Sequence, residues 1–511
     1  MKVSTESTSK RHPNDLSEEQ EKGPDEPKRG GLARWMLRWF FANTLISGLM
    51  ALAWLVLRSG PNPSRLAYPC QQAAFATAVA AFGVPLATAI VSLRHRFEAL
   101  RATRWGTFAT AGLVMCVVGF GAVALDPTGS GYNDGPRLTA SPDYRAAVYV
   151  VDDAGVIEGD HMTGLDDLIA MMGEEGLAFY ESRPALSMEA SPDGVVSADD
   201  VVLIKINYQW DQRGGTNTDL LKSLIRRIVD HPDGFTGEVV VVENAQFAST
   251  EAFDRAQNNA EDKGQSPHDV VASFEAKGYA VSHFDWTLLR TSRVDEFDEG
   301  NNDDGYVVSR FKRGLKGRAS YPKFTTDAGT PVSLRWGVWD ENREAYNRDQ
   351  LTFINLPVLK SHSATYGATA SVKHYMGLVT GRLGTNSHNA IRNGILGEVI
   401  GTIGLADLNI LDCIWVNGHP NRGPDTSYTD ATRVDMLLAS QDPVALDRWA
   451  VENVLIPTFE ANGYQAPWPQ PSADPVDPTS DFRIYLDNSM EQILAAGFDV
   501  TNDLNAVDVY R

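Results

Sequence analysis

The sequence predicts an α/β domain with a mainly parallel sheet and flanking helices, preceded by three transmembrane α-helices. Two observations lead to this fold class. Three long apolar segments without charge lie within the first 125 of 511 residues, and from about residue 144 short apolar runs alternate with amphipathic helical patterns. The charge changes at the same place, because the first 125 residues carry a formal charge of +6 and the rest of the chain carries −27.

Each apolar segment is about as long as the roughly 20 residues that a helix needs to cross a bilayer. A cleaved signal peptide fits less well, since the first segment starts late and two more follow it. Basic residues precede the first segment and fill the loop between the second and third, which places both parts in the cytoplasm. We therefore expect an integral plasma-membrane protein with a cytoplasmic N-terminus, the lipid bilayer as a partner and a large extracytoplasmic C-terminal domain. The segments are residues 39–57, 73–93 and 105–125.

The composition divides the chain into four parts. The N-terminal part has alternating charges, Ser and Pro and almost no large apolar residue, which is typical of a disordered tail. Within the α/β part, one long stretch has poor alternation and many Gly, Asn and Asp residues, and we expect it to be a lid over the strand ends. The parts are a cytoplasmic tail at 1–33, the three-helix membrane segment at 34–126, the α/β domain at 140–465 with the insertion at about 286–350, and a Pro-rich linker with a C-terminal packing segment at 466–511.

The α/β pattern is clearest at "DVVLIKIN", residues 200–207, a continuous apolar run of the kind that a strand buried on both faces requires. Residues 217–230 then place Leu and Ile on one helical stripe, and "EVVVVEN", residues 238–244, is a second buried strand. This strand, helix and strand should form a right-handed parallel unit. Further strands are expected at 279–284, 351–357, 409–416 and 433–440, and further helices near 268–277, 368–379, 443–455 and at the end of 483–498.

The composition and the missing motifs argue against several function classes. A sequence pI near 4.9 and the acidic C-terminal part argue against binding to nucleic acid, whose phosphates are held by basic surfaces. Cys413 is the only cysteine of the predicted extracytoplasmic domain, so no cysteine-ligated iron–sulfur cluster is expected there. No Walker loop, Gly-x-Gly-x-x-Gly fingerprint or Gly-x-Ser-x-Gly elbow is present, which argues against a nucleoside triphosphatase, a dinucleotide-dependent dehydrogenase and a serine hydrolase.

Polar residues follow several predicted strands, at the edge where open α/β sheets bind their ligands. They include Asn207 after the first strand, Asn244 after the second, Lys360 and His362 after the strand at 351–357, and Asp442 after the strand at 433–440. Each one could equally be an ordinary loop or capping residue. Together they predict a cluster of polar groups from distant segments.

A set of motifs in this region resembles the domain of unknown function 362 family over roughly residues 195–455. The motifs are "VVLIKIN", "FINLPVLKSHSATYGATASVKHYMGLV", an isolated His388, "DLNILDC", "RGP" and "LLASQDPVALD". The resemblance implies site residues at Lys205, Asn207, Lys360, His362, Lys373, His388, Asp412, Gly423 and Asp442. Ile206 stands where the family pattern has Pro, and the cysteine-rich ferredoxin-like module of many relatives is missing. The resemblance therefore implies a fold unit and a candidate site, but no reaction and no cofactor.

The chemistry of these residue types favours a small anion. Lysine is a compact point charge suited to carboxylate or phosphate, and burial can shift the pKa of lysine or histidine toward neutrality for acid–base work. We expect Lys360, His362, Lys373 and His388 as catalytic candidates. The ligand-binding candidates are Lys205, Asn207, Asn244, Asp412, Gly423 and Asp442. The domain would then bind, and as an enzyme transform, a small carboxylate or phosphate.

Three alternatives stay open. The domain could be a binding or sensory module without turnover, the cations could be structural partners of the many carboxylates, or a metal could use His362, His388, Asp412 and His419. The acidic loops at 189–194 and 295–305 hint at calcium but depart from the EF-hand pattern. Whether the protein is an enzyme, its protein partners and the identity of any cofactor are not predicted.

Overall fold

The computed structural model describes residues 138–511, apart from residues 160, 184–186, 247–257, 364–365 and 468–471. The chain divides into two units, residues 1–128 and 129–511, and the description below concerns the second unit. The predicted tail at 1–33 and the predicted membrane segment at 34–126 lie outside the described residues.

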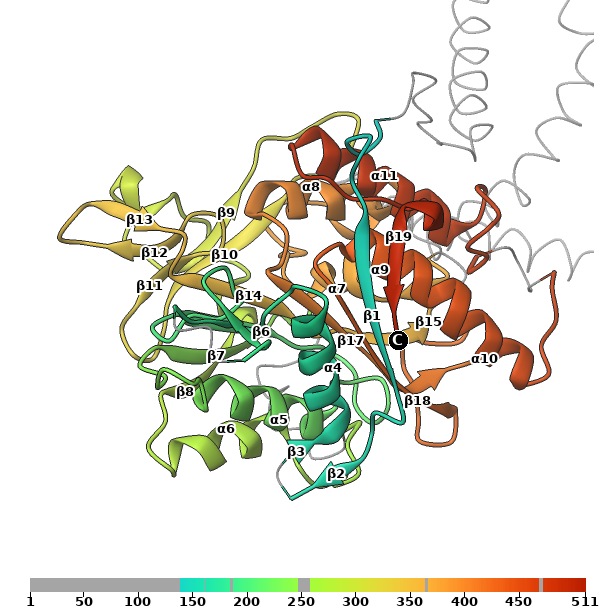
Figure 1. The fold of residues 1–511 in the computed structure, drawn as a ribbon. Coiled ribbons are helices and arrows are strands. Elements are labelled where there is room, and N and C mark those ends of the chain that lie inside the picture. Colours follow the sequence, from blue (N-terminus) through green and yellow to red (C-terminus); the bar gives the residue numbers. More distant parts are fainter. Residues whose placement is uncertain (1–137, 160, 184–186, 247–257, 364–365, 468–471) are drawn as a thin grey trace, which may run out of the picture. The chain divides into compact units, whose positions relative to one another are not determined.

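A mixed sheet forms the centre of this unit (Figure 1). The prediction of a mainly parallel sheet needs correction at three ladders, because β18 (Ala431–Ser440) runs antiparallel to both β17 and β1, and the short strands β15 and β16 are antiparallel to each other. For β18 the cause is local: after β17 the chain turns back through residues 418–430 without the crossover helix that a parallel neighbour requires. The order is β19 (Val507–Tyr510), β1 (Ala146–Asp152), β18 (Ala431–Ser440), β17 (Leu408–Asn417), β14 (Leu351–Asn355), β6 (Val201–Lys205), β7 (Glu238–Glu243) and β8 (Val281–Asp285).

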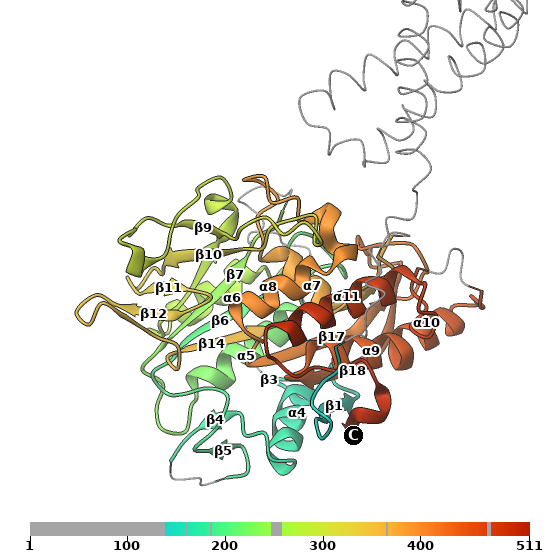
Figure 2. The same ribbon diagram turned by 90° about the horizontal axis from the view of Figure 1, so that it is seen from above.

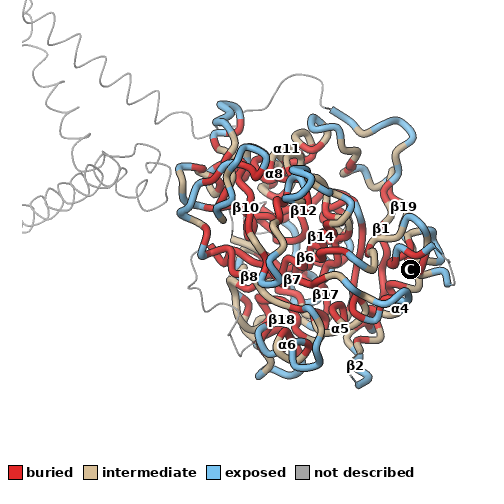
Figure 3. Tube along the Cα trace, turned by 90° about the vertical axis from the view of Figure 1, so that its left-hand side faces the viewer, coloured by how far each residue is buried: buried red, intermediate tan, exposed pale blue. Residues whose placement is uncertain are grey.

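Both faces of this sheet are covered, so the domain has three layers (Figures 1 and 2). Along β6, Val202 and Ile204 pack on one side while Val201 and Leu203 pack on the other, which is why the strand reads as a continuous apolar run. The strands of the sheet are buried along most of their length, and exposure concentrates in outer loops (Figure 3). One face carries α4 (Thr163–Glu174), α5 (Thr218–Val229) and α6 (Pro267–Glu275), and the other carries α7 (Ser371–His374), α8 (Ile395–Ile403), α9 (Pro443–Ala450) and α11 (Asp481–Ala495).

The helices begin where the sequence supplies capping groups. Asn217 caps α5 by accepting hydrogen bonds from two backbone amides, and Ser266 forms a capping box with Asp269 at the start of α6. Asp442 caps α9 in the same way and is followed by Pro443 at the first helical position. α9 continues as a π-helical turn at Val451–Leu455 and then as α10 (Ile456–Ala461), in agreement with the helix expected at 443–455.

The predicted insertion is itself folded. It contains an antiparallel sheet in which hairpin follows hairpin, and Tyr306, Phe324 and Val332 of this sheet belong to the same apolar core as α8. The alternation of apolar and polar residues is hard to see in the sequence, because the strands are short and Gly, Asn and Asp residues of the turns separate them. The strands are β9 (Gly305–Val308), β10 (Ser320–Thr325), β11 (Pro331–Ser333), β12 (Gly337–Asp340) and β13 (Ala345–Asn347).

Short strands complete the structure. β15 and β16 pair with each other, and β15 also pairs with β17, which attaches them to the central sheet. These short strands are β2 (Ile157–Glu158), β3 (His161–Met162), β4 (Tyr180–Glu181), β5 (Ala190–Ser191), β15 (Val358–Ser361) and β16 (Ala368–Thr369).

The structure does not bear out the prediction of an integral membrane protein with three transmembrane helices, and the predicted spans at 39–57, 73–93 and 105–125 lie outside the described residues. Among the described residues, no helix combines the length and the apolar character needed to cross a bilayer. The longest single α-helix described, α11, has 15 residues, which at 1.5 Å per residue extends about 22 Å against a hydrocarbon core of about 30 Å. The longer run of α9, the π-helical turn and α10 carries the charged residues Asp447, Arg448 and Glu452. The extracytoplasmic placement of the domain depended on the predicted spans and is not carried forward.

Close packing of α8 against α11 supports the face of the sheet that carries α7. A Cβ atom added at Gly397 would lie 1.9 Å from the backbone oxygen of Ser489, so only glycine fits there. We predict that Gly397→Ala lowers the free energy of unfolding by about 1–3 kcal/mol, measured by urea denaturation. Gly314→Ala is the control, because nothing lies within 4 Å of that position. Equal stabilities of the two variants would contradict this packing.

Candidate functional site

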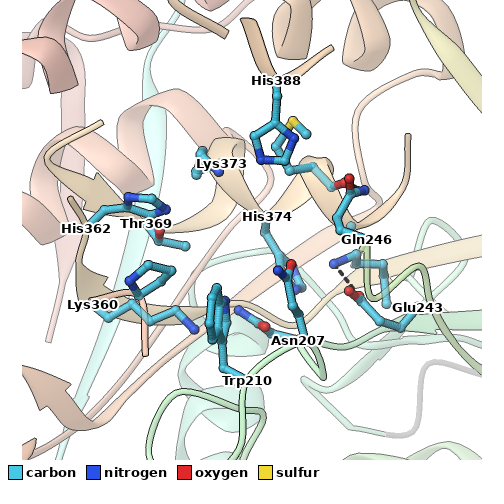
Figure 4. Close-up of a pocket in the computed structure, with 15 residues that line it drawn as sticks. Asn207, Trp210, Glu243, Gln246, Lys360, His362, Thr369, Lys373, His374 and His388 are labelled. Carbon is cyan, nitrogen blue, oxygen red and sulfur yellow. Dashed lines mark hydrogen bonds and ion pairs between the residues drawn. The ribbon is translucent and has the colours of Figure 1, made fainter. Parts of the chain in front are cut away.

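A pocket of about 230 Å³ lies at the carboxyl edge of the parallel strands (Figure 4). His362, Thr369 and Lys360 lie on one side of it, and Gln246 and Glu243 lie on the opposite side. The volume corresponds to about eight waters at roughly 30 Å³ each, so the pocket suits a small molecule. Its lining residues are Lys205, Asn207, Gln209, Trp210, Glu243, Gln246, Lys360, His362, Thr369, Lys373, His374, Met376, Gly377, His388 and Pro424.

Two neighbouring parallel strands end in an ion pair at the floor of the pocket. Lys205 is the last residue of β6 and Glu243 is the last residue of β7, and Lys205 Nζ lies 2.6 Å from Glu243 Oε2. Burial lowers the pKa of Lys205 and raises the pKa of Glu243 to about 7, while the attraction between the two groups opposes both shifts. A Cβ at Gly377 would lie 2.3 Å from Lys205 Nζ, so the backbone there presses directly against the pair.

Lys360 lies in β15, with 1% of its surface exposed. Its ammonium group donates a hydrogen bond to the backbone oxygen of Gly214, which carries no formal charge. Burial, followed by repulsion from Lys205, lowers the pKa of Lys360 to about 7. Lys360 is therefore a buried cation that Glu243 does not neutralise, because Lys205 occupies that carboxylate.

Lys373 is the third lysine of the pocket and lies in α7, with 7% of its surface exposed. Its Nζ atom is 5.0 Å from the centre of the Tyr366 ring, and within the described part of the chain it forms no ion pair within 4 Å. Burial, followed by repulsion from Lys205, lowers the pKa of Lys373 to about 7. A buried ammonium group without a carboxylate is unfavourable unless a ligand supplies the counter-charge.

The short helix α7 is held in place by a carboxyl group from α9. Asp447 accepts hydrogen bonds from the backbone amides of Ser371 at 2.6 Å and Val372 at 2.9 Å. Burial raises the pKa of Asp447 to about 8 in spite of these two bonds. Asp447 is the last residue of the "DPVALD" motif, and its structural consequence is to fix the backbone that carries Lys373 and His374.

α7 is much shorter than the helix expected at 368–379. It ends at His374 and continues as a 3₁₀ turn over Tyr375–Gly377. The following carbonyl groups bind Asn244 and Gln246 instead of helical amides: Asn244 N donates to the Gly377 oxygen at 2.8 Å, and Asn244 Nδ2 donates to the Val379 oxygen at 3.0 Å. The loop after β7 therefore fixes the turn after α7.

Three histidines line the pocket and are uncharged at neutral pH. Burial, together with repulsion from nearby lysines, lowers the pKa of His388 to about 4 and those of His362 and His374 well below the usual 6.5. His374 Nδ1 lies 2.7 Å from Asn355 Oδ1 and forms a hydrogen bond with this side-chain amide. The imidazoles can serve as neutral hydrogen-bonding groups beside the lysines.

Six of the residues expected at the site line this pocket: Lys205, Asn207, Lys360, His362, Lys373 and His388. The other four do not line it. Asn244 braces the turn after α7, and Asp442 caps α9 and accepts from Thr501 N at 2.8 Å. Gly423 packs against β15, where a Cβ would lie 2.4 Å from the Ser361 oxygen, and Asp412 is buried in β17 with its pKa raised to about 6 by burial. The chemical roles of all ten stay predictions.

Several lining residues were not selected from the sequence. Trp210 and Gln209 follow β6 by a few positions, and Thr369 precedes α7, so reading further along each loop would have found them. The Thr369 hydroxyl is buried and has no hydrogen-bond partner among the described residues, which marks it as a group for a ligand to satisfy. No described residue of the insertion at 286–350 lines the pocket.

In the described ranges, no three or more His, Cys, Asp or Glu side chains are placed so that they could hold a metal ion. His419, one of the residues of the metal alternative, lies with Nδ1 3.0 Å from the hydroxyl of Tyr464. Cys413 is buried and forms no disulfide bond within the described residues. Burial raises the pKa of its thiol well above the usual range.

Loss of the Asp447 carboxyl group should remove the two hydrogen bonds that hold the start of α7 against α9. We predict that Asp447→Ala lowers the free energy of unfolding by about 2–6 kcal/mol, since two buried amides each lose an acceptor at about 1–3 kcal/mol. Asp447→Asn retains one acceptor and should lie between Ala and wild type. Urea denaturation measures the order of the three proteins, and an Asn variant less stable than Ala would contradict this role.

Comparison with known proteins gives one family. Residues 326–452 match the model of the family described as Domain of unknown function (DUF362). The matched range contains Lys360, His362, Lys373, His388 and Asp447, but not β6 and β7, which supply the Lys205–Glu243 pair. No curated protein and no solved structure matches the chain. The family match supports the resemblance of this α/β domain to the DUF362 family.

Proposed function

We propose that the pocket binds a small anion, either a carboxylate or a phosphate. The observation that supports this most strongly is that Lys360 and Lys373 are buried in one cavity while the nearest lining carboxylate, Glu243, is taken by Lys205. Two desolvated ammonium groups without counter-charges are unfavourable in the free protein. A bound anion would remove that penalty, so the cost of burying the lysines becomes affinity for the ligand.

Neutral donors around the cations fit the same ligand. Asn207 and Thr369 line the pocket together with the uncharged histidines, and anionic oxygens accept hydrogen bonds from amide, hydroxyl and imidazole groups. The chain as a whole carries −21, so the long-range field repels anions and the pocket selects by local contacts. These features favour a specific small ligand over a general anion-attracting surface.

The lysines also equip the pocket for proton transfer. A general acid or base works best when its pKa is close to the working pH, and the pKa values of Lys360 and Lys373 are about 7. As an enzyme, the protein would use these groups to move a proton to or from the bound anion. As a binding module, it would use the same groups without turnover, and anion binding is the function that both alternatives share.

Binding should depend on the lysines. We predict that phosphate or succinate at about a hundred times its dissociation constant stabilises the full chain by about 2.7 kcal/mol, and that Lys360→Ala abolishes this effect. Thermal unfolding with and without the anion measures it. Lys277→Met, which removes an exposed positive charge just after α6 and outside the pocket lining, is the control and should respond like the wild type. Stabilisation that persists in Lys360→Ala would contradict the proposal.

Lys373→Met should be more stable than the wild type in the absence of ligand. Replacing a buried unpaired charge by an apolar side chain of similar length should add roughly 1–4 kcal/mol at pH 7. Between pH 7 and 10.5 the unfolded wild type binds more protons at this lysine than the folded protein, so wild-type stability rises with pH and the advantage of Met shrinks. Urea denaturation at pH 7 and pH 9.5 tests this sign, and destabilisation by Met at pH 7 would favour a structural role for the lysine.

Anion binding should be coupled to proton uptake. A bound anion favours the charged form of Lys360 and Lys373 and raises their pKa values from about 7, so at pH 8 the complex takes up protons from the buffer. Calorimetric titration with phosphate in two buffers of different ionisation enthalpy measures the number of protons. We expect between one and two, and heats that are independent of the buffer would show that the lysines are already charged in the free pocket.

A further inference from the structure

The buried cations around the pocket are unevenly paired. Four of them, Lys205, Arg213, Lys360 and Lys373, lie near the buried carboxyl groups of Glu243, Asp285, Asp412 and Asp447. Lys205 pairs with Glu243 at 2.6 Å. The remaining question is which of the other cations Asp412 neutralises.

Asp412 is linked to Arg213 rather than to a lysine. Arg213 donates to the backbone oxygen of Asn259, and the side-chain amide of Asn259 donates to Asp412 Oδ2 at 3.0 Å. The second oxygen of Asp412 accepts from the backbone amide of Ile414 at 2.9 Å, so both oxygens have hydrogen-bond partners other than Lys360. The guanidinium group of Arg213 also lies 4.0 Å from the centre of the Trp415 ring, and neither of these two residues lines the pocket.

Other acidic groups near these residues have partners of their own. Glu261 is an exposed carboxylate whose charge opposes the burial that lowers the pKa of Arg213, and its Oε1 atom lies 3.9 Å from Arg433 Nη1. Asp285, which follows Phe284 at the end of β8, caps the turn at Trp286–Leu289 and accepts from Thr287 N at 2.8 Å. Asp447 accepts from the backbone amides of Ser371 and Val372. Among the described residues, Lys360 and Lys373 therefore form no ion pair within 4 Å, and both line the pocket.

We propose that the ligand is a small dianion, a phosphate monoester or a dicarboxylate, whose two negative charges are matched by Lys360 and Lys373. This inference rests on the proposed anion site and names the charge of its ligand. A monoanion would leave one buried ammonium group unmatched, whereas a dianion satisfies both, and buried charges are stable only when paired. The uncharged part of the ligand would lie against the apolar lining, which is Trp210, Met376 and Pro424.

Matched pairs of probes separate a dianion from a monoanion of the same size. Succinate and succinamate differ by one carboxylate exchanged for an amide, and methyl phosphate and dimethyl phosphate differ by one methyl ester. At pH 8 the first member of each pair is a dianion, since the second pKa of a phosphate monoester is about 6. Calorimetric titration of the full chain at constant low ionic strength gives the four affinities, and the pair that binds identifies a carboxylate or a phosphate ligand.

The expected result is that the dianion of at least one pair binds at least tenfold more tightly than its monoanion. In Lys373→Met, where one unmatched cation remains, this preference should fall below threefold, while Lys277→Met keeps the full preference. Equal affinity for both members of every pair that binds would overturn the dianion but leave the anion site. Failure of all four probes to bind to the folded protein would overturn the proposed function and this inference together.

Discussion

Burial of three lysines beside one carboxylate is the constraint on which the rest of the site depends. Each ammonium group loses its hydration at the edge of the sheet, and among the described residues Lys205 alone forms an ion pair, with Glu243. The surrounding structure holds the other two in place without neutralising them: Lys360 through its strand β15 and Lys373 through α7, which Asp447 ties to α9. Because this arrangement costs stability in the free protein, it is easier to explain by a ligand than by a structural role.

The same constraint accounts for the architecture around the pocket. β6 and β7 are adjacent and parallel, so their last residues meet at one edge and can form the ion pair. Asn244 and Gln246 then bind the carbonyl groups after α7, which stops that helix and brings the Gly377 backbone against the pair. The large apolar core on each face of the sheet supplies the stability that a site with unmatched charge reduces.

The sequence predicts well the parts of the fold that local pattern decides. The run at 200–207, the amphipathic stretch after it and "EVVVVEN" correspond to β6, α5 and β7, because strands buried on both faces leave an unmistakable apolar run. The strand at 433–440 was predicted and corresponds to β18, but its antiparallel direction was missed, since that direction depends on a connection without a helix. The sheet of the insertion was also missed, because its strands are short and separated by turn residues. The predicted transmembrane helices have no counterpart in the described residues.

Reading beyond the strand ends found Lys360, and the family resemblance added Lys205 and Lys373, but neither showed which polar residues line the pocket and which hold other segments in place. Asp442 was expected at the ligand, yet Asp followed by Pro is a helix-start signal, and in the structure it caps α9. Asp447 and Gln246 were not selected, because a residue that acts by holding another segment leaves no local pattern. Pairing of Lys205 with Glu243 likewise depends on which strands are neighbours, and that is a property of the fold alone.

The central claim is that Lys373 is a desolvated lysine without an ion-pair partner among the described residues, whose pKa is lowered in the free protein. A bound anion would favour its charged form and raise that pKa. The most direct measurement is the titration of its side chain by nuclear magnetic resonance on protein labelled at lysine Cε, with the signal assigned by its loss in Lys373→Arg. The account predicts a pKa near 7 in the free protein and a clear rise when succinate or methyl phosphate is added. A pKa near the ordinary 10.5 that does not respond to either anion would contradict it.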